Sequence, residues 1–439
     1  MIILDRSFWL GLLLSAGSIF VLAHGLLGSG AMTTAALLST TTAALILTGP
    51  WQRFSPNAND AGFAILLTFI ALSFAAHGLG SDRKEIALLV LTLLGYPAAR
   101  LMSNVKFSVL IVVLIVVVSI GTIVTLVALV EQWSSRHGKP MVFGLFDSAA
   151  TQFATTLSVL LIFLTSQNLT LRKAIWIAAA TALPTMVFTA SQVRFALLAM
   201  LAALTAVFFI GPRKQRLPTG FVILVSMIAM LAGALGRSST TAVYFGQTAK
   251  TFGLDLGKAF EPPDSDPTLP LYTPGAPNVA PRPRPGCPEI STSNSVEIRQ
   301  RLLEEAITLL PSAGITGIGF DGFQSRSCLP GYPVHNSFLQ ALIELGWPAG
   351  LALIALVALG LRPQAFALAR TLPVARFAYC FLIFETLMSA VYGRVSRDSM
   401  LLIALGFAAA AIQQHTPNPI RLTPEDGTAS RLPESLQSG

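Results

Sequence analysis

Long apolar stretches recur along almost the whole chain, and this recurrence is what most constrains its fold. Most are long enough to cross a hydrocarbon layer of ~30 Å as a helix. Only helices and closed barrels satisfy their backbone polar groups in lipid, so the pattern predicts an all-α integral membrane protein with about 12 transmembrane helices. The stretches cover residues 8–27, 30–49, 61–79, 86–102, 107–130, 144–166, 173–190, 195–211, 219–236, 336–361, 376–392 and 399–413.

Composition excludes the ordinary soluble class. Of the 439 residues, 53% are hydrophobic and only 11% are charged. The net charge of +8 is then chiefly a signal of membrane topology, and we expect no nucleic-acid partner.

The distribution of Lys and Arg predicts the orientation. With a cytoplasmic N-terminus, the inner segments hold 14 of the 29 basic residues, the short outer loops hold 7, and one long outer loop holds the other 8. This positive-inside bias predicts nine transmembrane helices over 1–236, a periplasmic loop over 237–335, three more helices over 336–413, and a cytoplasmic tail over 414–439.

The first part of the long loop is rich in proline. Ten prolines lie between Glu261 and Pro288, which excludes a helix and favours an extended chain. Cys287 and Cys328 both lie in the loop. An oxidising compartment would allow them to form a disulfide, and two free thiols are the alternative.

The second part of the loop predicts an amphipathic helix over 294–310, lying on the membrane face. Asn294 suits its N-cap, and Pro311 is expected to help end it. Its apolar stripe consists of Ile298, Leu302, Ala306 and Leu309 or Leu310.

Two arginines on this helix have different surroundings. Arg301 has three carboxylates one helical turn away, on Glu297, Glu304 and Glu305, so its guanidinium can form an ion pair within the helix. This favours a surface role, although Arg301 remains a candidate substrate-binding residue. Arg299 has no carboxylate at these offsets, and its planar guanidinium suits a phosphate elsewhere.

Arg194 and His335 are the other candidates. Arg194 lies at the outer mouth of the eighth span, where positive charge runs against the topological bias; a snorkelling side chain is the alternative. His335 ends the long loop, and a side chain that titrates near neutral pH suits proton transfer with a hydroxyl; a polar helix cap is its alternative. Asn336 beside it is a candidate substrate-binding residue. Neither HExxH nor CxxC occurs, so we expect no metal and no cofactor.

Several of these segments together resemble a known family. They are Asn294-Ser-Val-Glu-Ile-Arg299, Gly317-Ile-Gly319, His335-Asn336-Ser with Glu344-x-Gly346, and the earlier Ser191-Gln-Val-Arg194. Their order and spacing are similar to the signature of the bacterial O-antigen ligase and polysaccharide polymerase superfamily. The aromatic residue usual after the loop arginine is absent, and the proline-rich insert departs from the family pattern.

The resemblance implies a GT-C-like fold and a metal-independent, inverting glycosyltransferase in the bacterial inner membrane, with its active site facing the periplasm. The donor would be a glycan on undecaprenyl diphosphate. Arg194 and Arg299 would bind the diphosphate, and His335 would activate the acceptor hydroxyl.

The acceptor distinguishes two activities. A ligase uses the lipid A core, and an O-antigen or exopolysaccharide polymerase uses another lipid-linked unit. No outer arginine is followed by glycine eleven residues later, a pattern of some O-antigen polymerases, and this favours the ligase. A polytopic transporter is the second alternative, although acids near the middle of the spans are few, and we expect Glu344 to serve in helix packing.

Overall fold

The computed structural model of the protein describes residues 6–28, 31–49, 51, 54–79, 83–101, 107–133, 138–238, 241, 287, 295–329 and 331–413. The predicted proline-rich segment, apart from Cys287, and the predicted tail 414–439 lie outside these residues.

The described part of the chain is helical, with one isolated β-bridge between Val142 and Phe146. Before the long loop the helices are α1 (Arg6–Leu14), α2 (Ala16–Leu27), α3 (Ala31–Leu47), α4 (Ala58–His77), α5 (Arg83–Arg100), α6 (Phe107–Glu131), α7 (Ala149–Ser166), α8 (Leu171–Ala190), α9 (Phe195–Ile210) and α10 (Arg213–Gly236). Within the loop and after it they are α12 (Ser295–Ala313), α13 (Gly322–Arg326), α14 (Ser337–Gln340), α15 (Trp347–Gly360), α16 (Pro363–Thr371), α17 (Pro373–Tyr392) and α18 (Ser399–Gln413).

Seven stretches of the described residues are helical, long and apolar enough to cross a membrane. An eighth is obtained if α1 and α2, which meet at an 80° bend, count as one span. The apolar helices α9 and α18 are shorter, and α5 carries Arg83, Lys84, Glu85 and Arg100. The all-α membrane class is therefore confirmed, while the count of 12 spans stays a prediction.

Burial separates central helices from peripheral ones. Most of α7 is buried inside the protein (83%), whereas small shares of α4 and α10 are buried (22% and 28%). The exposed side chains of α10 include Leu224, Ile228, Leu231 and Leu235. A continuous apolar surface of this kind is stable in lipid rather than in water.

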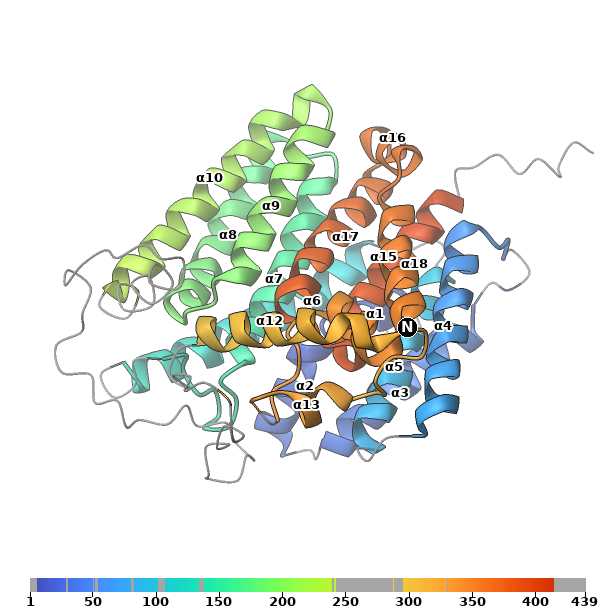
Figure 1. Ribbon diagram of the computed structural model, residues 1–439. Coiled ribbons are helices and arrows are strands. Elements are labelled where there is room, and N and C mark those ends of the chain that lie inside the picture. The colour runs from blue at the N-terminus through green and yellow to red at the C-terminus, as the bar shows by residue number, and fades with distance from the viewer. Residues whose placement is uncertain are drawn as a thin grey trace, which may run out of the picture.

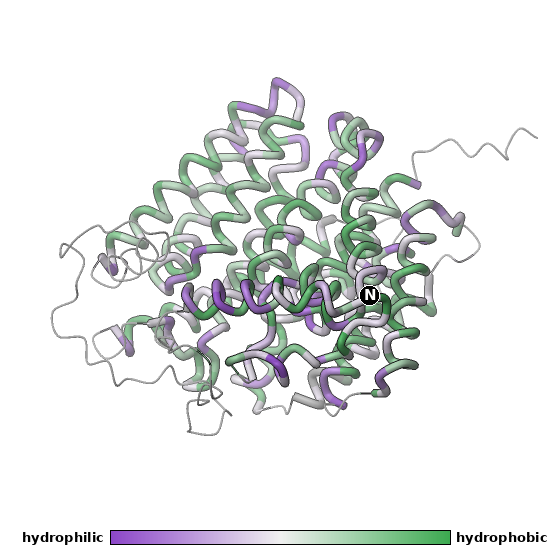
Figure 2. The backbone as a smooth tube through the Cα atoms, in the orientation of Figure 1, coloured by the Kyte–Doolittle hydropathy of each residue, from purple (hydrophilic) through white to green (hydrophobic). Residues whose placement is uncertain are grey.

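Figure 1 shows α8, α9 and α10 side by side, with α12 running across the bundle at a steep angle to them. Figure 2 shows hydrophobic residues along the middle of these three helices. Hydrophilic residues gather at the α9–α10 turn and in the first turns of α12.

Polar contacts at the two ends of the helix bundle show which helix ends lie together. At one end, Arg376 near the start of α17 donates to the Ser166 carbonyl at the end of α7 (2.9 Å) and to Gln215 near the start of α10 (2.9 Å). At the other end, which we call the loop end, Arg394 just after α17 pairs with Asp321 of the long loop (3.0 Å).

Besides the predicted span 8–27, which is bent between α1 and α2, two predicted elements differ from the structure. The predicted span 336–361 is broken, because α14 passes into one π turn (Ala341–Leu345) and α15 begins anew at Trp347. Gly346, with a φ of 98°, makes this break, and Pro348 follows in the first turn of α15. The amphipathic helix runs past Pro311 to Ala313 and ends before Gly314, which has a φ of 61°.

Candidate active site

The described part of the long loop shares a small hydrophobic core with the first turns of the helix that follows it. Ile298, Leu302 and Ala306 of α12 are buried against Phe323 and Val334. The apolar stripe of α12 therefore packs against the loop and against Leu339 and Ile343 of the helix that follows it, while its expected place on the membrane face stays a prediction. Burial of each large apolar side chain contributes roughly 1.5–3 kcal/mol, which holds α12 in a fixed position above the bundle.

The loop crosses the break before α15 at very short backbone distances. The Ile318 amide donates to the Ile343 carbonyl and the Trp347 amide donates to the Gly314 carbonyl, both at 2.9 Å. A Cβ on Gly317 would lie 2.2 Å from the Glu344 carbonyl oxygen, and one on Gly346 would lie 2.1 Å from that of Ile315. Glycine is therefore required at both positions, and the crossing fixes the loop on the helix break.

Glu344 reinforces this crossing. Its side chain is buried and accepts hydrogen bonds from the amides of Asp321 (3.1 Å) and Phe323 (3.2 Å) and from Gln340 (2.8 Å). Each carboxylate oxygen thus serves backbone or amide groups, which agrees with the packing role expected from the sequence.

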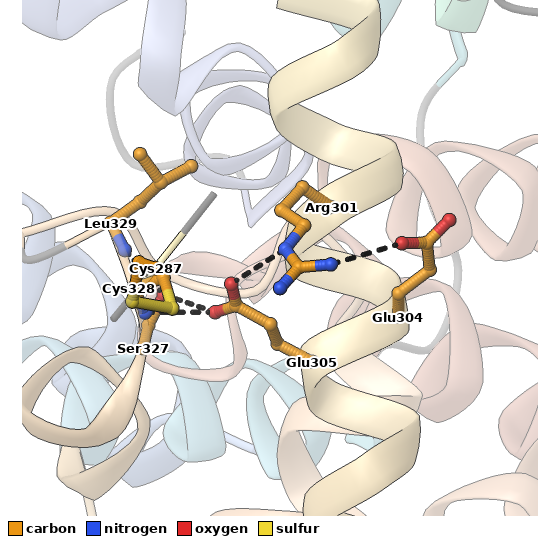
Figure 3. Close-up of a disulfide and its surroundings, with 7 residues drawn as sticks. All are labelled: Cys287, Arg301, Glu304, Glu305, Ser327, Cys328 and Leu329. Atoms are coloured by element: carbon orange, nitrogen blue, oxygen red, sulfur yellow. Dashed lines mark hydrogen bonds and ion pairs between the residues drawn. A yellow bond between two sulfur atoms is a disulfide. The ribbon is translucent and has the colours of Figure 1, made fainter. Parts of the chain in front are cut away.

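A second set of contacts, which we call the disulfide clamp, joins α12 to the segment around Cys328 near the end of the loop (Figure 3). Cys287 and Cys328 form a disulfide, with their Cα atoms 5.7 Å apart. Glu305 accepts hydrogen bonds from the Cys328 amide (3.0 Å), the Ser327 hydroxyl (2.7 Å) and Arg301 Nε (3.0 Å). Arg301 also approaches Glu304 at 3.6 Å, so its guanidinium is paired with carboxylates of its own helix.

Arg299 lies instead between two aromatic rings. Its guanidinium carbon is 4.6 Å from the Tyr392 ring centroid and 5.8 Å from that of Phe195. Among the described residues, no carboxylate forms an ion pair with it. The half-buried cation therefore keeps its N–H donors available for an anion that is not part of the described chain.

Arg194 is brought to the same end of the bundle. It occupies the N-cap position of α9, directly before Phe195, whose ring contacts both Arg299 and Tyr392. The side chain of Arg194 is half-buried. The N-terminus of a helix carries partial positive charge, so α9 adds to the positive potential here.

The positive charges of Arg299 and Arg394 act on the imidazole of His335. Burial, and then these two arginines, lower the pKa of its imidazole to about 4. The ring is therefore neutral at neutral pH and able to accept a proton. Asn336 accepts a hydrogen bond from the Leu339 amide (3.0 Å), and this cap begins α14 directly after His335.

The structure thus brings Arg194, Arg299 and His335 to the loop end, and Arg301 belongs to the disulfide clamp. Residues 179–354 match the family model described as O-antigen ligase. These residues are an O-antigen ligase domain. All three residues of the predicted catalytic set lie within it, and the resemblance to the O-antigen ligase and polymerase superfamily is confirmed. No curated protein and no solved structure matches the chain.

The site also draws on residues outside the O-antigen ligase domain that the sequence reasoning did not single out. Arg394 pairs with Asp321 (3.0 Å) and Glu85 (3.4 Å), which ties the loop to α5 and α17. Lys139 Nζ lies 5.9 Å from the ring centroid of Tyr392. In the sequence, Arg394 and Lys139 had entered only the count of outer basic residues. Both lie at predicted outer positions, where positive charge runs against the positive-inside bias, and the same signal had singled out Arg194.

Metal ligands do not gather in the part of the chain that the structure describes, since no three of its His, Cys, Asp and Glu side chains are grouped to hold a metal ion. The expectation of a metal-independent O-antigen ligase domain stays a prediction.

Proposed function

We propose that this protein transfers a glycan from undecaprenyl diphosphate to a hydroxyl of the lipid A core, as an O-antigen ligase. Its domain makes it a membrane glycosyltransferase of the ligase or polymerase type. Its place in the bacterial inner membrane, with the site facing the periplasm, is part of the proposal and is supported by the positive-inside count.

One observation carries the proposal: the Arg299 guanidinium has aromatic neighbours but no carboxylate partner among the described residues, and its charge reaches His335. A diphosphate leaving group gains negative charge as its bond to the sugar breaks. Guanidinium donors aimed at that charge stabilise the transition state without transferring a proton. Arg194 would bind the same diphosphate from the start of α9.

His335 supplies the base. As the acceptor oxygen attacks the anomeric carbon, the neutral imidazole takes its proton. The bond between that carbon and the phosphate oxygen breaks, and undecaprenyl diphosphate leaves with the electron pair. A single displacement of this kind inverts the anomeric configuration. Asn336 places the imidazole by capping the helix that follows it.

The donor would also activate this base. In the free protein, the charges of Arg299 and Arg394 help to keep the pKa of His335 low. A bound diphosphate brings negative charge to these arginines and so raises the pKa of the imidazole. His335 becomes a stronger base only once the donor is in place, which limits transfer to the donor-bound protein.

The decisive test uses the full chain in nanodiscs, with an undecaprenyl-diphosphate glycan and a lipid A core acceptor. We expect Arg299→Gln and His335→Ala each to lower kcat by about 100- to 1,000-fold. The matched control is Arg326→Gln, because Arg326 is an exposed arginine of the same loop. Transfer at the wild-type rate by the double variant of Arg299 and His335 would refute the assignment.

A deletion strain separates ligase from polymerase. Loss of the ligase leaves finished polymer on the lipid carrier and none on the core. Loss of a polymerase leaves single units, and that result would replace the ligase proposal with the polymerase one.

A further inference from the structure

The ring of Tyr392 is shared by two cations from different parts of the chain. The Arg299 guanidinium carbon lies 4.6 Å from the ring centroid and Lys139 Nζ lies 5.9 Å from it. The two charges are therefore at most 10.5 Å apart, the sum of these distances. Like charges held this close repel each other unless an anion lies between them.

Lys139 is held in place from both sides. Arg237, at the end of α10, donates to the Gly138 carbonyl (3.1 Å) directly before it. Gln132, just after α6, binds Met141 twice, accepting from its amide (2.8 Å) and donating to its carbonyl (2.9 Å). The backbone on each side of Lys139 is thus fixed by a side chain, which is unlike a lysine on a free surface loop.

Lys139 is half-buried as a residue, and its ammonium group has no carboxylate within ion-pair distance among the described residues. Its hydrogen bond, to the Thr151 hydroxyl, is long (3.4 Å). A lysine has three N–H donors, so donors remain for a ligand.

We infer that Lys139 is a third cationic ligand of the donor and binds the phosphate on its lipid side, while Arg299 binds the phosphate on its sugar side. This rests on the proposed function. Hydrogen bonds from a cation to phosphate oxygen are ~2.8 Å long, so two cations no more than 10.5 Å apart can each hold one phosphate of the same diphosphate. Arg299 takes the sugar side because, of the two cations on the Tyr392 ring, it is the one whose charge acts on His335, where the acceptor attacks.

A lipid headgroup offers the same phosphate chemistry, so the test must separate the two sources. We would measure the binding of fluorescent undecaprenyl diphosphate to the full chain in phosphatidylcholine nanodiscs. Undecaprenyl monophosphate and phosphatidylglycerol serve as competitors. The variants are Lys139→Gln, Lys139→Arg and, as the matched control, Lys84→Gln, which removes an exposed charge at the start of α5.

We expect Lys139→Gln to weaken diphosphate binding about tenfold, as for the loss of one charge-assisted hydrogen bond. The monophosphate should lose about twofold or less, because Arg299 alone can hold it. Lys139→Arg should restore most of the affinity, and Lys84→Gln should bind as the wild type does. Thermal melting of each variant in the same nanodiscs shows whether it is folded.

Three results would overturn the inference. Unchanged diphosphate binding by folded Lys139→Gln removes Lys139 from the site. A loss confined to phosphatidylglycerol makes Lys139 a contact to bulk lipid. Failure of the wild type itself to bind the diphosphate better than phosphatidylglycerol overturns the proposed function, and the role of Lys139 with it.

Discussion

At the scale of residues, Arg299 and Arg301 show how two positions on one helix separate binding from support. Arg301 meets Glu304 and Glu305, and Glu305 holds the loop beside the disulfide. Arg299 meets Phe195 and Tyr392 instead. The carboxylates at one turn from Arg301 were visible in the sequence, and their absence around Arg299 was too.

This contrast predicts opposite effects of two matched substitutions. Arg301→Gln should cost about 1 kcal/mol of stability, because it removes a partly exposed ion pair, and should lower activity only slightly. Arg299→Gln should leave the melting temperature almost unchanged and abolish most transfer. Thermal melting and turnover on the same preparations test both. A large loss of turnover in Arg301→Gln without loss of stability would instead make Arg301 a substrate-binding residue.

His335 predicts a pH dependence whose direction follows from its surroundings. Its pKa is lowered to about 4, so the free protein keeps a neutral base down to that pH. Activity should fall as the pH drops through this value, because a protonated imidazole accepts no proton. The acid limb of kcat/KM, which reports the free protein, should lie near pH 4, and that of kcat, which reports the donor complex, should lie higher.

Arg299→Gln offers a check on this assignment. The charge of Arg299 is one cause of the low pKa, so its removal should move the limb of kcat/KM upward, toward the usual value for histidine. A limb that stays in place would mean that another group titrates in the pH profile.

At the scale of elements, the loop is positioned by its crossing over the broken helix. Gly317 has a φ of 75° and lies against the Glu344 carbonyl, whereas Gly314 has a φ of 61° and nothing within 4 Å of the place where a Cβ would lie. Alanine at either position would lose about 1–2 kcal/mol of folding free energy, because a residue with a Cβ is strained in the left-handed region. Alanine at Gly317 also meets the carbonyl oxygen, so the crossing must open.

We therefore expect Gly317→Ala to destabilise the loop by about 1–3 kcal/mol more than Gly314→Ala. Limited proteolysis between α12 and α13 and turnover should both report this difference, since a displaced loop carries Arg299 and His335 away from Arg194. Equal behaviour of the two variants would show that the close approach to the helix break is not needed for the site.

Periodicity and composition were enough to predict the all-α membrane class and to place α12 to within three residues at its C-terminal end. They were not enough for the break at Gly346, because the apolar stretch continues through it and hydropathy does not report backbone torsion. Tyr392 and Lys139 were missed for a different reason. Tyr392 is unremarkable in its own segment, and Lys139 shares its outer position with several other basic residues. Only the packing of α17, α12 and the loop before α7 brings the two together.

At the scale of the whole molecule, the described polar contacts gather at two ends with different chemistry. At the loop end lie Arg299, Lys139 and Arg194, the three proposed ligands of the diphosphate. At the opposite end, Arg376 is buried and donates to the carbonyls of Ser166 and Ala369 and to Gln215, so helix termini and an amide satisfy it without an external ligand. The proposed function requires these ends to face different compartments.

Cysteine labelling can test this orientation because the background is low. Cys380 is buried, and Cys287 and Cys328 are bonded to each other. We would introduce Thr308→Cys on the exposed side of α12 and Lys214→Cys at the exposed start of α10, at opposite ends of the bundle. In intact spheroplasts, a membrane-impermeant maleimide should label Thr308→Cys and spare Lys214→Cys, and after permeabilisation it should label both. The reverse pattern would place the site in the cytoplasm, where a donor displayed on the outer leaflet could not reach His335, and the proposed reaction would fail with it.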